Sequence, residues 1–175
     1  MTNKAYFFIR LTCGEAKQQS AALLEEALSA FWASTGEEPE KLSRTELGKP
    51  YFPSGRFHLS VTHTGSLYAA VFSPVPVGID AERAGEARLT VSRRKFSDWE
   101  KKLPFSTVWC GKEAVAKLLG GGLQLVNKIS IKDGYAEYQG KRYTLREKIV
   151  NRTYRVMIAT EEGRNWDGAE TLSEK

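Results

Sequence analysis

Val77-Gly78-Ile79-Asp80-Ala81-Glu82-Arg83 is the most informative stretch of this 175-residue chain. The apolar residues Val77 and Ile79 alternate with other residues, which predicts a strand. Side chains two positions apart on a strand share a face, so Asp80 and Glu82 point to the same side. Two neighbouring carboxylates repel each other unless a cation lies between them. This stretch therefore indicates a strand that presents a cation site.

A second informative stretch runs from Phe105 to Leu119 and has the apolar spacing of a helix, with three glycines after it that would end the helix. Trp109, Glu113 and Lys117 follow one another at i, i+4 spacing and form one stripe. Oxygen ligands from two elements suit magnesium, which keeps positions open for phosphate oxygens of a substrate. Together the two stretches indicate magnesium-dependent transfer of a phosphate-bearing group, with Lys117 holding a second phosphate oxygen.

Both stretches also have a purely structural interpretation. A Glu–Lys pair at i, i+4, such as Glu113 and Lys117, is most often a solvated helix face that contributes a few tenths of a kcal/mol. An Asp-x-Glu segment after a strand is often a turn entry with solvated carboxylates. Taken one at a time, the two stretches leave both interpretations open.

Six short segments follow one another in a recognisable order. They are Gly48-Lys49-Pro50, Leu59-Ser60-Val61-Thr62-His63-Thr64-Gly65, Val77 to Glu82, Phe96-Ser97-Asp98-Trp99-Glu100, Trp109 to Lys117, and Gly120-Gly121-Gly122-Leu123. This order resembles the 4′-phosphopantetheinyl transferases, in particular the broad-specificity type that activates surfactin synthetase and other enzymes with carrier proteins. The first and last thirds of the chain carry little of the resemblance.

The resemblance implies an α+β fold in which two subdomains, each a helix with an antiparallel sheet, are related by a pseudo-twofold axis. It also implies transfer of the phosphopantetheine arm of coenzyme A to a serine of an apo acyl or peptidyl carrier protein, with release of 3′,5′-ADP. Asp80, Glu82 and Glu113 would then hold the magnesium ion. Glu113 would also accept the proton of the serine.

The same resemblance assigns the residues that would bind coenzyme A. Lys117 would hold the α-phosphate side, and Lys112 would add to the same positive field. Thr62 and His63 fall in the Ser-His-Ser-Gly-like segment, so His63 would contact the 3′-phosphate or the pantetheine, with Lys49 as a second contact. A histidine that satisfies a hairpin turn is the alternative interpretation of His63.

Two departures from the family pattern concern positive charge. Gly121 stands where a lysine is common in the family, and glycine also makes that loop more flexible. The segment Ser20 to Leu24 offers no cation where the family usually has an arginine. Lys17 and Arg10 are possible substitutes for that arginine.

The chain divides by pattern into an N-terminal half, residues 1–83, a C-terminal half, residues 84–161, and a polar tail, residues 162–175, that we expect to be frayed. Each half reads as a helix with a strand meander, and a further helix is expected around residues 90–103. The active site of such a fold lies between the halves. One chain can therefore build the whole site, and we expect a monomer.

Composition narrows the choice of partners. The net charge of +5 and the isoelectric point near 9.2 favour an acidic partner, such as a carrier protein or coenzyme A. Basic residues are scattered without an aromatic platform, so no nucleic-acid partner is expected. The sequence has neither a membrane-length apolar run nor a signal-peptide pattern, and its two cysteines form no disulfide framework, so we expect a cytoplasmic protein. A catalytically silent module that binds coenzyme A or a carrier protein is the alternative function.

Overall fold

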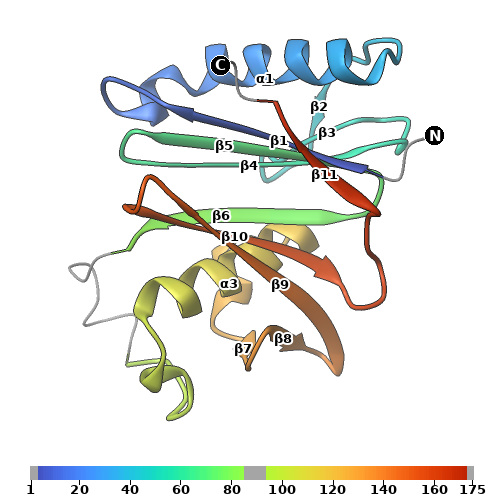
Figure 1. Cartoon of the computed structure of the whole chain (residues 1–175). Helices are drawn as coiled ribbons and strands as arrows, with labels where there is room; N and C mark the ends of the chain where they lie inside the picture. Colours follow the sequence, from blue (N-terminus) through green and yellow to red (C-terminus); the bar gives the residue numbers. More distant parts are fainter. Residues whose placement is uncertain (1–3, 85–93, 173–175) are drawn as a thin grey trace.

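The computed structural model describes residues 4–84 and 94–172, which form two main sheets and two long helices. Figure 1 shows α1 lying along the outer side of one sheet, while α3 packs against the other. In chain order the elements, with η for a 3-10 helix, are β1 Lys4–Leu11, η1 Ala16–Gln19, α1 Ser20–Thr35, β2 Ser43–Arg44, β3 Pro50–Tyr51, β4 His58–Thr64, β5 Leu67–Ser73, β6 Val77–Arg83, η2 Glu100–Lys102, α3 Phe105–Leu119, α4 Leu123–Val126, β7 Ser130–Ile131, β8 Tyr135–Tyr138, β9 Lys141–Val150, β10 Tyr154–Glu161 and β11 Gly168–Thr171.

The first sheet has the strand order β11-β1-β5-β4 and is covered on both faces. Every residue of β5 is buried, and its side chains alternate between two cores. Tyr68, Ala70 and Phe72 pack with α1, where the rings of Phe72 and Phe31 stack 4.3 Å apart. The alternate residues of β5 pack against the second sheet. Strand β5 is therefore mainly apolar from Leu67 to Phe72, as expected for a strand with both faces buried.

The second sheet has the order β6-β10-β9-β8-β7, and α3 packs on β6 and β10. Val77, Ile79 and Ala81 of β6 face the first sheet. Because side chains alternate along a strand, Asp80 and Glu82 face the other way, toward α3. The prediction that these two carboxylates share a face is confirmed.

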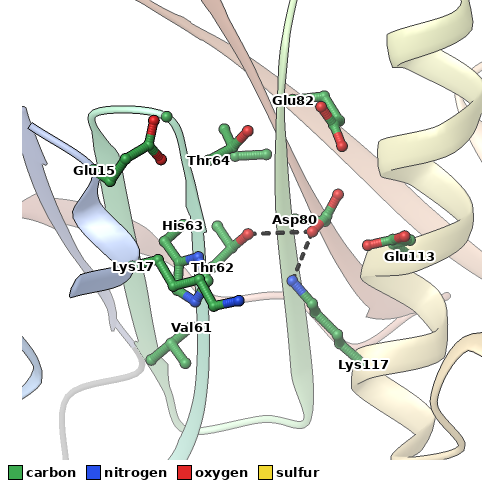
Figure 2. Close-up of a pocket in the computed structure, with 12 residues that line it drawn as sticks. Glu15, Lys17, Val61, Thr62, His63, Thr64, Asp80, Glu82, Glu113 and Lys117 are labelled. Atoms are coloured by element: carbon green, nitrogen blue, oxygen red, sulfur yellow. Dashed lines mark hydrogen bonds and ion pairs between the residues drawn. The ribbon is translucent and has the colours of Figure 1, made fainter. Parts of the chain in front are cut away.

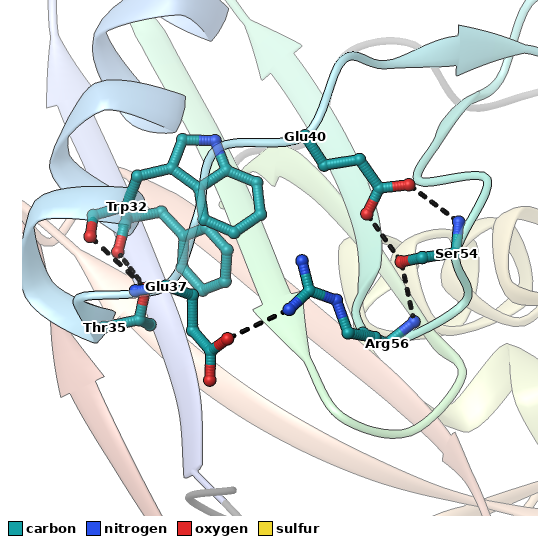
Figure 3. Close-up of polar contacts among 7 residues, drawn as sticks. Trp32, Thr35, Glu37, Glu40, Ser54 and Arg56 are labelled. Carbon is teal, nitrogen blue, oxygen red and sulfur yellow. Dashed lines mark hydrogen bonds and ion pairs between the residues drawn. The ribbon is translucent and has the colours of Figure 1, made fainter.

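The loop that follows α1 is tied to the loop that precedes β4 (Figure 3). Arg56 forms an ion pair with Glu37 at 3.0 Å. Glu40 accepts hydrogen bonds from the backbone N–H of Ser54, at 2.7 Å, and from its hydroxyl, at 2.5 Å. These contacts fix the entry to β4, which supplies one wall of the candidate site.

The structure confirms the α+β class and the predicted helix Phe105–Leu119, which ends at Gly120 with a left-handed φ of 72°. The helix expected at residues 90–103 is not found: residues 94–103 hold turns and the short η2, while residues 90–93 lie outside the described part of the chain. Phe96, Glu100 and Lys112 pack together there, so the segment is held by its side chains rather than by a long helix.

Part of the expected polar tail is ordered as a strand. Residues Gly168–Thr171 form β11, which pairs in parallel with β1, and Leu172 is buried beside them. The sequence Gly-Ala-Glu-Thr has no apolar alternation that would predict a strand. The strand forms because its backbone pairs with that of β1.

The boundary between the two sheets lies before residue 83, since β6 belongs to the second sheet. The division into two halves stays a prediction. No helix in residues 4–84 and 94–172 is long and apolar enough to cross a membrane.

Candidate active site

A pocket of about 610 Å³ lies between β4, β6 and α3. Its walls come from both sheets, because β4 belongs to the first sheet and β6 to the second. Six of the predicted site residues line it: Thr62, His63, Asp80, Glu82, Glu113 and Lys117. Figure 2 shows Asp80 between the Thr62 side of the pocket and the helix that carries Glu113 and Lys117.

Asp80 is the most deeply buried carboxylate of the pocket, with 3% of the residue exposed. Its Oδ1 atom accepts hydrogen bonds from Lys117 Nζ at 2.6 Å and from Thr62 Oγ1 at 3.2 Å. Its Oδ2 atom is buried and has no hydrogen-bond partner among the described residues. A buried carboxylate oxygen without a partner is costly, so this atom is suited to receive a ligand.

Glu113 comes close to Asp80 from the helix side, and burial together with the charge of Asp80 raises its pKa to about 8. Lys117 opposes this shift, and the more distant Glu82 adds to it. The carboxyl group of Glu113 is therefore largely protonated at neutral pH when no cation is bound. Crowded carboxylates with one raised pKa are typical of functional sites.

The pocket chemistry fits a hard cation. Four carboxylates line it, those of Glu15, Asp80, Glu82 and Glu113, against only two lysines. Carboxylate oxygens are the ligands that magnesium prefers. The described residues do not yet form a ready group of three metal-binding side chains, and the ammonium of Lys117 balances Asp80 instead. Binding a cation would thus require Glu82 and Glu113 to move toward Asp80.

The wall opposite the helix carries Glu15, Lys17 and His63. His63 lines the pocket, and burial followed by the charges of Lys117 and Lys17 lowers its pKa. Lys17 also lines the pocket and forms no ion pair with any described residue; Figure 2 shows its ammonium pointing toward the side of Asp80 and Lys117. Arg10, the other candidate substitute for the family's arginine, pairs with Glu26 and does not line the pocket.

Two predicted contacts of coenzyme A lie outside this pocket. Lys49 Nζ donates hydrogen bonds to the carbonyl oxygens of Lys117, at 2.5 Å, and Leu118, at 3.3 Å. It thereby caps the C-terminal end of α3, where a positive charge also opposes the negative end of the helix dipole. Lys49 still lines a smaller hollow next to Lys117.

Lys112 is buried on another face of α3. Its ammonium pairs with Glu100 Oε1 at 2.9 Å, and both side chains are almost fully buried. Glu100 also accepts hydrogen bonds from the backbone N–H groups of Ile131 and Ser97. Successive residues of a helix point about 100° apart, so Lys112 cannot share the direction of its neighbour Glu113. The structure does not bring Lys112 to the pocket.

No sequence pattern indicated that Glu15 lines the pocket. Its place depends on a contact distant in the chain: the backbone N–H of Ala16 donates to the carbonyl oxygen of Gly65 at 2.8 Å, which holds η1 against the turn after β4. The structural role of Glu100 was also missed, although its place three residues after Ser97, whose hydroxyl accepts from the Glu100 N–H, fits a local capping pattern.

Two known proteins are similar to this chain in sequence. The chain is 30% identical over 92 residues to a 4′-phosphopantetheinyl transferase of Bacillus subtilis, a match that covers 46% of the chain and 41% of that protein. This chain is similar in sequence to the 4′-phosphopantetheinyl transferases. It is also 30% identical over 97 residues to 4′-phosphopantetheinyl transferase Sfp of Bacillus subtilis strain 168, with coverage of 49% and 43%. The matches thus span less than half of either transferase, and no family model matches the chain.

The resemblance to the phosphopantetheinyl transferases that the motifs predicted is therefore confirmed. Segments that the sequence singled out for it, from β4, β6 and α3, meet at one pocket. The segments that carry Lys49 and Glu100 instead support the helix that carries Glu113.

Proposed function

We propose that this protein transfers the 4′-phosphopantetheine arm of coenzyme A to a serine of an apo acyl or peptidyl carrier protein and releases 3′,5′-ADP. The observation that carries the proposal is the approach of Glu113 to Asp80 in a pocket that also presents the ammonium groups of Lys17 and Lys117, in a chain similar to the phosphopantetheinyl transferases. Coenzyme A offers phosphates for Lys17 and Lys117. A carrier protein offers a serine hydroxyl for Glu113.

The proposed reaction is a displacement at phosphorus. The serine oxygen forms a bond to the phosphorus that bears the pantetheine, and the bond from that phosphorus to the bridging oxygen breaks. The bridging oxygen leaves with 3′,5′-ADP, and the serine proton passes to the carboxylate of Glu113. A bound magnesium ion, held by Asp80, Glu82 and Glu113, would keep these carboxylates ionised and offset the charge that develops on the leaving oxygen.

The cations of the pocket have separate tasks in this proposal. Lys117 pairs with Asp80 in the ligand-free pocket, so a substrate phosphate would compete with Asp80 for its ammonium. Lys17 does not have to break an ion pair to bind a phosphate, because it forms none with the described residues. It is therefore the cation most readily available to a phosphate group, beside His63.

The finer features of the fold belong to the same proposal. We propose that the halves 1–83 and 84–161 are related by the pseudo-twofold axis that the family resemblance implies. The packing of α1 on the first sheet and of α3 on the second supports this relation. Both walls of the pocket come from one chain, which supports a protein that works as a monomer.

Intact-protein mass spectrometry tests the proposal. An apo carrier protein is incubated with this protein, coenzyme A and magnesium, and with a chelator in a parallel sample. We expect a magnesium-dependent mass gain of one phosphopantetheine. Binding of coenzyme A without any mass gain across several acyl and peptidyl carrier proteins would instead favour the silent binding module.

Glu113→Gln sharpens the test, because it removes a proposed metal ligand and the proposed base together. We expect turnover to fall at least about 100-fold while the protein stays folded. Glu38→Gln, which changes an exposed carboxylate after α1 in the same way, serves as the matched control. Near-normal turnover of the Glu113 variant would refute the role of Glu113.

A further inference from the structure

Tyr154 links the two sheets behind the pocket. It lies in β10 of the second sheet and is 2% exposed. Its hydroxyl oxygen accepts a hydrogen bond from the backbone N–H of Ser66 at 3.2 Å and shares a second one with Ser66 Oγ at 2.9 Å. Ser66 lies in the turn between β4 and β5 of the first sheet. The phenol and this turn touch closely, since a Cβ added to Gly65 would stand 3.0 Å from the Tyr154 oxygen.

The same turn also holds the segment that carries Lys17. The carbonyl oxygen of Gly65 accepts the backbone N–H of Ala16, and that of Ser66 accepts the backbone N–H of Thr12, both at 2.8 Å. Ala16 is fully buried, whereas Lys17 beside it points into the pocket. A continuous set of hydrogen bonds thus runs from Tyr154 through the turn to η1.

Other polar links between the sheets lie deeper in the pocket. Thr62 donates to Asp80 at 3.2 Å, and the backbone N–H of Ile79 donates to the hydroxyl of Ser60 at 3.1 Å. These bonds hold the middle of β4 against β6. They do not include the turn at Gly65 and Ser66, which is bonded to Tyr154 instead. The backbone of Gly65 in this turn has a left-handed φ of 52°.

We propose that Tyr154 is a positioning residue: its hydroxyl fixes the Gly65-Ser66 turn and, through that turn, sets the distance between the Lys17–His63 wall and the Asp80–Glu113 wall. Tyr154 does not itself line the pocket, so it acts on a ligand only through the turn and η1. The effect on coenzyme A rests on the proposed function. The effect on the turn and on η1 does not.

The test variant is Tyr154→Phe, which removes the hydroxyl but keeps the ring that packs in the core and lies under Arg83. We expect faster amide hydrogen exchange in residues 12–17 and 62–67. The exchange rates in α3 should not change. We also expect the dissociation constant of coenzyme A, measured by calorimetry, to rise about fivefold, the effect of about one hydrogen bond. The KM for coenzyme A should rise by the same factor, while kcat at saturating coenzyme A stays within about twofold of wild type.

Tyr68→Phe is the matched control. Tyr68 is an equally buried tyrosine whose hydroxyl has no hydrogen-bond partner among the described residues. Its loss should change neither the exchange of residues 12–17 nor the affinity for coenzyme A. If Tyr154→Phe folds poorly, Ser66→Ala removes the Oγ contact from the half-buried end of the pair and should show the same pattern more weakly.

Two results would overturn the inference. One is unchanged exchange in residues 12–17 when Tyr154 or Ser66 is altered. The other is a lower melting temperature with wild-type affinity for coenzyme A, which would mean a structural role alone. If the wild-type protein does not bind coenzyme A, the proposed function fails, and hydrogen exchange alone decides the positioning role.

Discussion

Gly78 of β6 lies directly against the backbone of Ala114 in α3. A Cβ added to Gly78 would stand 1.9 Å from the carbonyl oxygen of Ala114 and 2.6 Å from the amide nitrogen of Leu118. These neighbours are backbone atoms inside a helix, so they cannot move aside alone. The lack of a side chain at Gly78 lets α3 come close enough for Glu113 and Lys117 to meet Asp80.

Gly78→Ala should therefore push α3 away from β6. We expect a loss of at least about 3 kcal/mol in the free energy of unfolding, at the upper end of overpacking effects, measured by urea denaturation. Gly111→Ala is the control on the same helix, because its added Cβ would meet the end of the flexible Ile131 side chain at 3.0 Å. The gain in helix propensity, about 1 kcal/mol, offsets that contact. Equal stability of both variants would contradict the close approach at Gly78.

The raised pKa of Glu113 predicts a pH dependence of stability. Burial and Asp80 raise this pKa from 4.5 to about 8. Between these pH values the folded protein holds a proton that the unfolded chain releases, so stability is lost as pH rises through this window. Glu113→Gln carries no such proton, and in cation-free buffer it should exceed wild type by about 1–3 kcal/mol at pH 8 and by little at pH 5.

Urea unfolding at several pH values, with a chelator present, measures this difference. Addition of magnesium should stabilise the wild type at pH 8 more than the variant, because a bound cation favours the ionised carboxylate. A stability gap that does not change with pH would mean that Glu113 keeps an ordinary pKa.

The buried pair of Lys112 and Glu100 should matter for stability. Burial raises the pKa of Glu100, but hydrogen bonds from Ile131 and Lys112 outweigh it, so the pKa lies below its usual value and the carboxylate is charged. Glu100→Gln leaves the Lys112 ammonium buried without a counter-charge, which costs about 3–5 kcal/mol. The double variant with Lys112→Met should cost less than the sum of the single variants in thermal denaturation. Additive costs would show that the two side chains do not interact.

Lys17 should contribute to the binding of coenzyme A. Lys17→Met removes from the pocket wall an ammonium that forms no ion pair with the described residues, and we expect the dissociation constant of coenzyme A to rise about tenfold, as for a charge-assisted hydrogen bond. Arg10→Met, which removes a cation that pairs with Glu26, should leave the affinity near wild type. Calorimetry at two salt concentrations measures both. The reverse order of effects would assign the phosphate contact to Arg10.

Sequence patterns predicted the parts of the site that depend on local periodicity. The bounds of α3 and the shared face of Asp80 and Glu82 follow from repeats of 3.6 and 2 residues, and the structure has both. The relationship to known transferases followed from the order of the motifs rather than from any single one.

Sequence patterns did not predict the contacts between segments that are distant in the chain. Lys112 points away from Glu113 because of helix geometry, but its partner Glu100 lies in a distant segment that was expected to be helical. Lys49 turns to the end of α3 because the last carbonyl groups of a helix lack partners. The strand β11 forms only because β1 offers an unpaired edge.

The pairing of β6 with β10 has a consequence for the order of folding. Asp80 faces Met157 across this pair, so the strand that carries the acidic wall finds its neighbour only after α3, β7, β8 and β9 have been synthesised. Pairings of such long sequence separation form slowly, whereas α1 and the β4–β5 hairpin need only nearby residues. The pocket is thus completed late, because its acidic strand has no place in a sheet until β10 has been synthesised.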